Sequence, residues 1–221
     1  MAKEKWYAVR KGKKPGIYRT WGECKAQVDH VSGAEYKSFK TKEEAEDYLN
    51  PPTVEGLLEG IEEKDIATAY VDGSFNIGDW IYGSGVYFLY RGKKIGIMCS
   101  GDDPSYARMR NVAGEIKAAM IAVQMAESAH AKCVEIFHDY TGISSWAEGA
   151  WAANLECTKA YKKFMQEHRK NIRIVFRKVA GHSGDEGNDI ADSLARTASG
   201  VYSSVESNLN DKLDTIQTVY L

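Results

Sequence analysis

The sequence predicts an α/β protein of two domains, in which a small module precedes a larger domain with a mixed sheet flanked by helices. Adjacent prolines at 51 and 52 interrupt the chain and end any helix before them. After this break, apolar or alternating runs typical of strands are separated by segments with a helical period. The domains we expect are a module at 1–50, a linker at 51–66, a larger domain at 67–199 and a C-terminal tail at 200–221.

The composition is that of a globular protein, with 43% hydrophobic and 27% charged residues. No apolar run approaches the roughly 20 residues that cross a bilayer, and the first residues lack the apolar stretch of a secretory signal. The four cysteines lie far apart, with no CxxC pair and no Cys/His cluster at zinc spacing, which is typical of reduced thiols. We therefore expect a cytoplasmic protein without a membrane partner.

The net charge of −2 averages two unlike parts of the chain. Residues 1–42 contain eleven Lys/Arg and four Asp/Glu, a balance of +7. The rest of the chain holds 18 of the 29 basic residues and 27 of the 31 acidic ones, a balance of −9. A basic first segment points to an anionic partner, whereas an acidic remainder could gather carboxylates around metal ions.

The first fifty residues predict a compact module with a very small core. The expected strands cover 6–10, 17–18 and 36–39, and the expected helices cover 21–30 and 41–49. Each helix opens with a capping box, formed by Thr20 with Glu23 and by Thr41 with Glu44. A basic turn at 11–16 separates the first two strands.

The larger domain predicts three antiparallel strands, followed by helix, strand, helices, strand and helix. The expected strands cover 67–72, 82–90, 94–99, 133–138 and 172–179, and the expected helices cover 107–129, 155–169 and 188–198. This order indicates a mixed five-stranded sheet flanked by helices. The tail after Gly200 has no pattern that assigns it to an element.

Three carboxylates occupy positions from which they could meet. Asp72 and Asp139 each end a strand, and parallel strands deliver ligands at their carboxyl ends. Glu115 shares an alanine-rich helix face, where a charge is seldom buried without a partner. Hard cations such as Mg²⁺ take oxygen ligands, and two divalent ions can support phosphodiester hydrolysis. Taken singly, each residue also fits an ordinary turn aspartate or a glutamate favoured by the helix dipole.

The last helix contains two competing aspartates. Asp192 flanks the apolar face of this helix and can reach inward, whereas Asp189 points almost directly away, so we expect Asp189 to be solvated. His182 precedes the helix in a loop of small residues. There it could shuttle protons, or it could simply be an exposed loop histidine.

Together these motifs resemble those of the ribonuclease H1 family. The resemblance covers about 67–199 and is carried by YVDGS at 70–74, AGE at 113–115, HDYTGI at 138–143 and GHSGDEGNDIAD at 181–192. It implies a ribonuclease H-like fold that hydrolyses the RNA strand of RNA–DNA hybrids with two Mg²⁺ ions, for which Mn²⁺ is expected to substitute. The metal ligands that it implies are Asp72, Glu115, Asp139 and Asp192.

The same resemblance assigns further residues to the substrate. His182 corresponds to a flexible-loop histidine that assists the nucleophilic water or product release. The residues that fall where the family touches the nucleic-acid strands are Gly73, Ser74, Asn76 and Asn111. Some family members carry a basic protrusion between two central helices, but residues 149–154 contain no basic residue here. The larger domain would then lack its own basic handle for the substrate.

The first fifty residues resemble the hybrid-binding domain that precedes many such enzymes. The segments at 6–28 and 35–45 carry this likeness. It implies that Trp21 and Tyr36 stack on DNA sugars and that Lys37 holds a phosphate. Ser38 stands where vertebrate relatives have a second lysine, which would weaken the phosphate contact. The expected partner is therefore an RNA–DNA hybrid, and no obligate protein partner is implied.

Two alternatives remain open from the residues alone. One is another nuclease of the same fold, such as a resolvase or an integrase. The other is a non-catalytic hybrid-binding protein, which would need a broken carboxylate set, whereas the set here is intact.

Overall fold

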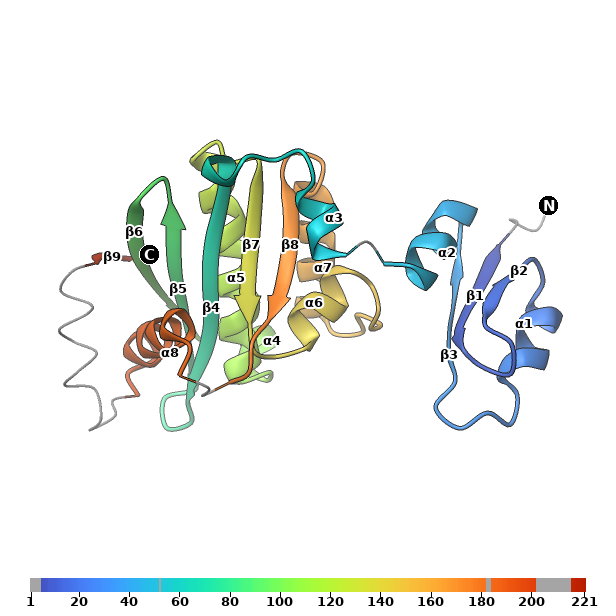
Figure 1. Cartoon of the computed structure of the whole chain (residues 1–221). Helices are drawn as coiled ribbons and strands as arrows, with labels where there is room; N and C mark the ends of the chain where they lie inside the picture. Colours follow the sequence, from blue (N-terminus) through green and yellow to red (C-terminus); the bar gives the residue numbers. More distant parts are fainter. Residues whose placement is uncertain (1–4, 52, 182–183, 202–215) are drawn as a thin grey trace. The chain divides into compact units, whose positions relative to one another are not determined.

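The computed structural model describes residues 5–51, 53–181, 184–201 and 216–221. The chain forms two compact units, residues 1–57 and 58–221, and each unit has its own sheet (Figure 1). The break falls in α3 (Val54–Leu58), a short helix that follows the prolines. Among the described residues, no helix is long and apolar enough to span a membrane.

The first unit is a three-stranded antiparallel sheet in the order β2-β1-β3 with two helices. Its elements are β1 (Trp6–Lys11), β2 (Gly16–Tyr18), α1 (Trp21–Val28), β3 (Glu35–Phe39) and α2 (Lys42–Leu49). Both predicted capping boxes are present, because Thr20 and Thr41 each exchange hydrogen bonds with the glutamate three residues later. The predicted order of elements is confirmed in this unit.

The two helices of this unit pack on opposite faces of its sheet. Side chains alternate along a strand, so Val9 lies on one face, where it is buried with Cys24 and Val28 of α1. Arg10 lies on the other face and donates hydrogen bonds to the backbone carbonyl of Tyr48 in α2. We refer to these surfaces as the α1 face and the α2 face.

The second unit contains a mixed sheet in the order β8-β7-β4-β5-β6-β9. Its strands are β4 (Ile66–Asn76), β5 (Ile81–Tyr90), β6 (Lys93–Gly101), β7 (Cys133–His138), β8 (Arg173–Lys178) and β9 (Gln217–Tyr220). The first three are antiparallel, and β7 and β8 continue the sheet in parallel from β4. The five predicted strands are all present in the predicted order, but β4 continues to Asn76, so Asp72 lies within this strand and not at its end as expected.

The sixth strand, β9, corrects the five-stranded prediction. It pairs in parallel with the edge strand β6, and Ile216 just before it is buried against Tyr87 of β5 and Leu194 of α8. A four-residue strand has too little pattern to be recognised alone. Its pairing depends on where the preceding residue is buried, and this follows from the tertiary structure.

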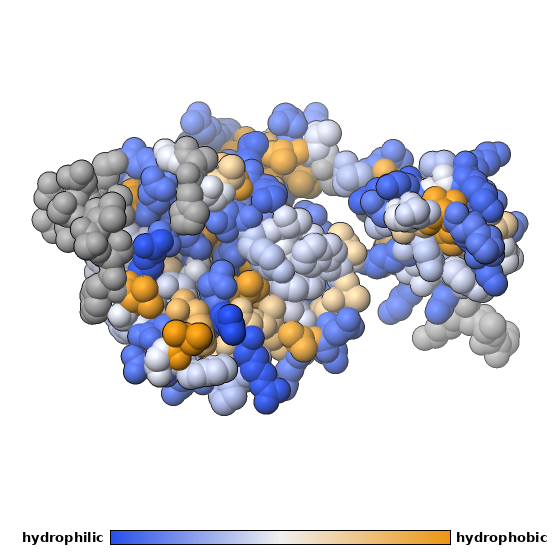
Figure 2. Space-filling model, turned by 90° about the horizontal axis from the view of Figure 1, so that it is seen from below, coloured by the Kyte–Doolittle hydropathy of each residue, from blue (hydrophilic) through white to orange (hydrophobic). Residues whose placement is uncertain are grey.

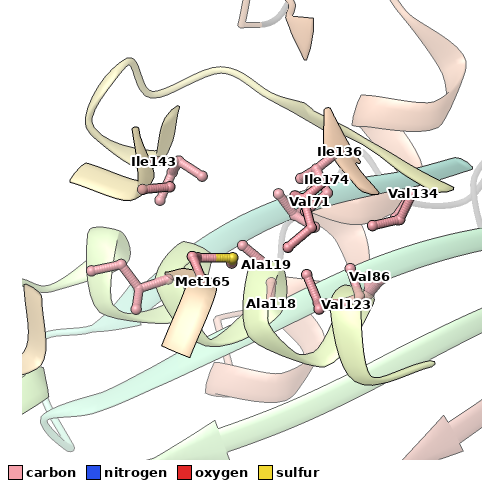
Figure 3. Close-up of a cluster of buried hydrophobic side chains, with 14 of the residues drawn as sticks. Val71, Val86, Ala118, Ala119, Val123, Val134, Ile136, Ile143, Met165 and Ile174 are labelled. Atoms are coloured by element: carbon pink, nitrogen blue, oxygen red, sulfur yellow. The ribbon is translucent and has the colours of Figure 1, made fainter. Parts of the chain in front are cut away.

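Helices cover both faces of the larger sheet (Figure 1). The main ones are α5 (Asn111–Ser128), α7 (Glu156–His168) and α8 (Glu186–Ser199), and shorter ones are η1 (Glu63–Asp65), α4 (Pro104–Ala107) and α6 (Gly142–Ala147). The principal core lies between the sheet and α5 with α7, where Val71 and Val86 pack near Ala119 and Val123 (Figure 3). The last helix, α8, lies on the opposite face over β4, β5 and β6.

The helix expected at 107–129 begins later in the structure, at Asn111, and a separate short helix, α4, ends at Ala107. Asp103 caps α4, and Arg110, at a φ of 54°, interrupts the chain before α5 begins. A non-glycine residue in this region of backbone space is uncommon. The apolar period of the sequence is continuous across this point, so hydrophobicity alone could not show the break.

Candidate active site

Four carboxylates from four separate segments of the chain lie at one end of the larger sheet. Asp72 lies in β4, Asp139 directly follows β7, Glu115 is in the second turn of α5, and Asp192 is in α8. β4 and β7 pair in parallel, with Tyr70 opposite Phe137. Asp72 and Asp139 each follow one of these paired residues by two positions. Neighbouring strands lie about 5 Å apart, so the register alone sets these two carboxylates side by side.

Gly73 allows α5 to press directly on β4 beside Asp72. A Cβ atom at this position would lie 2.0 Å from the carbonyl oxygen of Asn111 and 2.4 Å from the amide nitrogen of Glu115. Any side chain here would displace the start of α5. The glycine therefore fixes how close Glu115 comes to Asp72, which is a packing role that the sequence did not reveal.

The carboxylates interact electrostatically. The pKa of Asp72 is raised to about 7, mainly by burial and also by the charges of Asp139 and Asp192, against the opposing effects of the Gly73 amide and Arg196. Glu115 is 2% exposed, and burial, followed by the charges of Asp72 and Asp139, raises the pKa of its carboxyl well above the usual range. These four residues therefore form a single cluster of like charge.

The backbone after β7 organises this cluster. The amide of Tyr140 donates to Glu115 Oε1 at 3.3 Å, and the amide of Asp139 also bonds this carboxylate. Lys178 Nζ, at the end of β8, donates to the backbone carbonyl of Asp139 at 2.9 Å. Gly181 lies so close to Asp139 that a Cβ there would be 2.6 Å from Oδ2.

The structure distinguishes the two aspartates of α8 by their neighbours. Asp192 accepts a hydrogen bond from Arg196 Nε at 2.9 Å, and its charge acts on Asp72. Asp189 is partly buried rather than fully solvated as expected, so burial alone does not separate the two. The electrostatic contact with Asp72 favours Asp192 as the member of the cluster.

The donor set fits hard divalent cations. It consists of carboxylate oxygens, which Mg²⁺ and Mn²⁺ prefer. Within the described ranges, no three such side chains are gathered tightly enough to enclose an ion. An open set of this kind is compatible with Mg²⁺, which usually keeps several waters and takes further oxygens from substrate phosphates.

The residues expected to touch nucleic acid have additional structural roles. The hydroxyl of Ser74 is buried and accepts from the Ser199 hydroxyl at 3.0 Å, which ties β4 to α8. The Asn76 amide donates to Asp79 and to the backbone carbonyl of Ser199. Asn111 is exposed as the first residue of α5. His182 falls outside the residues that the structure describes.

The surface at this end of the larger unit is not purely polar. The turn between β4 and β5 exposes Ile77 and Trp80, which are 68% and 54% accessible. Trp80 packs edge-on against Phe75 with ring centroids 5.7 Å apart. Viewed from the end at which β7 and β8 terminate, apolar residues are interspersed among charged ones (Figure 2).

In the first unit, the predicted aromatic pair is exposed and in contact. Trp21 and Tyr36 are 45% and 44% accessible, and their ring centroids are 5.7 Å apart. Trp21 is therefore a surface residue rather than a core aromatic. Lys37 follows Tyr36 on β3 and so points to the α2 face, where its Nζ lies 5.6 Å from the Phe39 ring centroid. Ser38 shares the α1 face with Tyr36.

Sequence reasoning missed two groups that act on the carboxylates. Arg196 pairs with Asp192, and the i, i+4 spacing of these residues on one helix was a usable signal. The Tyr140 amide bonds Glu115, and no sequence pattern indicates this contact because it joins two elements 25 residues apart.

Comparisons with known proteins agree with this architecture. Residues 62–200 match the RNase H family, and residues 5–49 match the family described as ribonuclease H1 N-terminal domain. Ribonuclease H1 of Homo sapiens is 26% identical in an alignment that covers 86% of this chain and 88% of the human protein. Ribonuclease H of Saccharomyces cerevisiae is 55% identical over 47 residues, which are 21% of this chain and 14% of the yeast protein.

Solved structures show the same fold at low identity. RNase H1 from Halobacterium salinarum superposes with a TM-score of 0.51 at 18% identity, over 60% of this chain and 96% of that one. The N-terminal RNase H domain of a Mycobacterium tuberculosis protein gives a TM-score of 0.52 at 15% identity, over 61% and 94% of the two chains.

Proposed function

The chain belongs to the ribonuclease H family, and we propose that it hydrolyses the RNA strand of RNA–DNA hybrids, which its basic N-terminal module helps to bind. The observation that carries this proposal is the cluster of Asp72, Glu115, Asp139 and Asp192, in which mutual repulsion and burial raise the pKa of Asp72. Such a cluster suits a cationic cofactor and a phosphodiester substrate. The names of the relatives, ribonuclease H1 and ribonuclease H, support the same activity.

We assign these four carboxylates as the ligands of two Mg²⁺ ions, for which Mn²⁺ should substitute. When bound, the metal would supply an activated water and stabilise charge on the phosphate and the leaving oxygen. Ionised carboxylates are needed for this role, so a cation that offsets their repulsion would favour the ionised form of Asp72.

The chain's own groups orient these ligands. The Gly73 amide donates to Asp72 Oδ1 at 2.6 Å, and Arg196 holds Asp192 from the next turn of α8. The Tyr140 amide holds Glu115 Oε1. Three of the four carboxylates thus have one oxygen hydrogen-bonded by the protein, while their other oxygens remain for metal and water.

The N-terminal module would bind substrate through its α1 face. Trp21 and Tyr36 present an exposed aromatic surface there, and stacking of this kind is tolerant of sequence. Basic residues of the first 42 positions would add phosphate contacts that weaken with salt.

Cleavage assays on matched RNA–DNA hybrid, double-stranded RNA and double-stranded DNA test the proposal. We expect cleavage of the hybrid alone, confined to the RNA strand, dependent on Mg²⁺ and abolished by a chelator. Cleavage of double-stranded DNA would favour a resolvase-like or integrase-like nuclease. Binding of hybrid without cleavage in Mg²⁺ or Mn²⁺ would favour a non-catalytic hybrid-binding protein.

A further inference from the structure

His138 is a fully enclosed polar residue that the activity described above does not use. It is the last residue of β7, directly before Asp139, and only 1% of it is exposed. Its Nδ1 lies 3.0 Å from the backbone carbonyl of Tyr140, and its ring packs edge-on against Phe176, 5.8 Å away. A buried polar side chain is an informative observation, and His138 is almost completely buried.

The tautomer of this histidine follows from its partner. A carbonyl oxygen can only accept, so Nδ1 must carry the proton of the bond to Tyr140. Within the described residues, Nε2 has no hydrogen-bond partner. Burial also lowers the pKa of His138, which is consistent with a neutral ring that has one donor and one acceptor nitrogen.

The bond from His138 closes a short loop around the metal-ligand turn. Tyr140 accepts from His138 through its carbonyl and donates to Glu115 through its amide. Between them, the carbonyl of Asp139 accepts from Lys178 Nζ. The backbone of residues 139–140 is therefore held from three sides, and both Asp139 and Glu115 depend on its position.

We propose that His138 is a positioning residue for the candidate metal site. The Nδ1–H group of His138 fixes the backbone of residues 139–140. The position of this backbone then determines the separation of the Asp139 and Glu115 carboxylates. This inference rests on the proposed function, because those carboxylates matter only if they hold metal. Groups that hold metal ligands in place through hydrogen bonds typically contribute 10-fold to 100-fold in metal affinity or activity.

Two isosteric variants test the proposal. The side-chain nitrogen of His138→Asn can occupy the place of Nδ1, whereas that of His138→Gln reaches only the place of Nε2. We expect His138→Gln to raise the half-saturating Mg²⁺ concentration and lower kcat, each by about 10-fold to 100-fold, with KM for hybrid nearly unchanged. His138→Asn should recover most of both values.

A packing control separates positioning from stability. Phe176→Leu removes the ring beside His138 but leaves the Nδ1 bond intact. It should lower Tm while keeping the Mg²⁺ dependence close to that of the unmodified protein. Mg²⁺ binding is measured by calorimetry on each full-length variant without substrate, so this readout is independent of cleavage.

The unmodified protein supplies a second test that needs no variant. Nitrogen-15 NMR of the imidazole should show a protonated Nδ1 and an unprotonated Nε2 for His138. The opposite tautomer would overturn the proposal, as would equal Mg²⁺ affinity in the Asn and Gln variants. If the protein binds Mg²⁺ in this pattern but cleaves no hybrid, the proposed function fails while the positioning role stands.

Discussion

The two units of this chain differ in charge and in the exposure of their candidate functional groups. The first concentrates basic residues before position 42 and exposes Trp21 beside Tyr36. The second carries most of the acidic residues and gathers four of them in one cluster, in which Glu115 is only 2% exposed and Asp72, Asp139 and Asp192 are half-buried. One unit therefore exposes its functional groups to solvent, and the other partly buries them.

The difference separates binding from chemistry. Exposed aromatic and basic groups can contact a hybrid of any sequence. Because they stay hydrated in the free protein, their exposure costs the folded state little free energy. Buried carboxylates destabilise the unit that contains them unless a cation offsets their charge. Within the first unit, α2 is acidic, and all basic residues of the unit except Lys42 lie before that helix. The following predictions test this contrast.

The largest effect is expected from Asp72→Asn. This change removes a charged ligand at the centre of the cluster, so hydrolysis should fall below detection, consistent with loss of metal-based stabilisation worth several kcal/mol. Hybrid binding should survive, because the first unit is unchanged. Cleavage and binding are measured on the same variant, and near-normal turnover would contradict the two-metal assignment.

The next largest effect separates the two aspartates of α8. Asp192→Asn should lower kcat by about 100-fold or more, whereas Asp189→Asn should change it by less than about 3-fold, because only Asp192 is coupled to Asp72. The two variants are matched in chemistry and helix. Equal losses in steady-state assays would show that the assignment within α8 is wrong.

The cluster should also make the metal-free protein sensitive to pH. The pKa of Asp72 is about 7 in the folded state against 3.8 for the ordinary carboxyl. The folded state therefore has its full stability below about pH 4, where Asp72 is protonated in both states. It loses stability as the pH rises to about 7, because the carboxyl ionises more readily in the unfolded state. This loss should cost on the order of 2 to 4 kcal/mol of unfolding free energy.

Denaturant unfolding in a chelator at pH 5 and pH 8 measures this effect. Asp72→Asn should flatten the pH dependence, and Mg²⁺ should restore stability to the unmodified protein at pH 8. The first unit should show no corresponding change. An identical pH profile for the unmodified protein and the variant would exclude Asp72 as the source.

A smaller effect is expected when the first unit is removed. A chain beginning at Leu58 retains all four carboxylates and Asp65, whose buried carboxylate pairs with Arg91 and Lys132. It should still hydrolyse hybrid, but with KM raised about 10-fold and earlier release of long substrates. Comparison at two salt concentrations checks the cause, because phosphate contacts weaken with salt. Equal affinity and processivity with and without residues 1–57 would assign the module another purpose.

The smallest effect is expected at the aromatic pair. Trp21→Ala should weaken hybrid binding by about 1 to 2 kcal/mol, because stacking contributes on this scale. Trp21→Phe retains a ring and should recover much of the loss. Binding is measured with catalytically inactive Asp72→Asn protein. If Trp21→Ala binds hybrid with full affinity, the exposed aromatic pair does not contribute to hybrid binding.

The sequence alone predicted most elements, and the family resemblance of its motifs singled out the four carboxylates as a site, which stays a prediction. Strand alternation, helical period and capping boxes are local, and local preferences were strong in both units. The two capping boxes at Thr20 and Thr41 formed as predicted. The motifs also indicated the ribonuclease H family, to which the comparisons assign the chain.

What only the tertiary structure decided depends on contacts between distant segments. The strand β9 exists because Ile216 is buried by α8 and β5, and Gly73 is required because α5 presses on β4. The register of β3 on β1 places Tyr36 opposite Val9 and therefore on the α1 face. The bond from His138 to the Tyr140 carbonyl and the bond from the Tyr140 amide to Glu115 arise where β7 ends against α5. A local pattern cannot encode such contacts, because they are fixed by the packing of whole elements against each other.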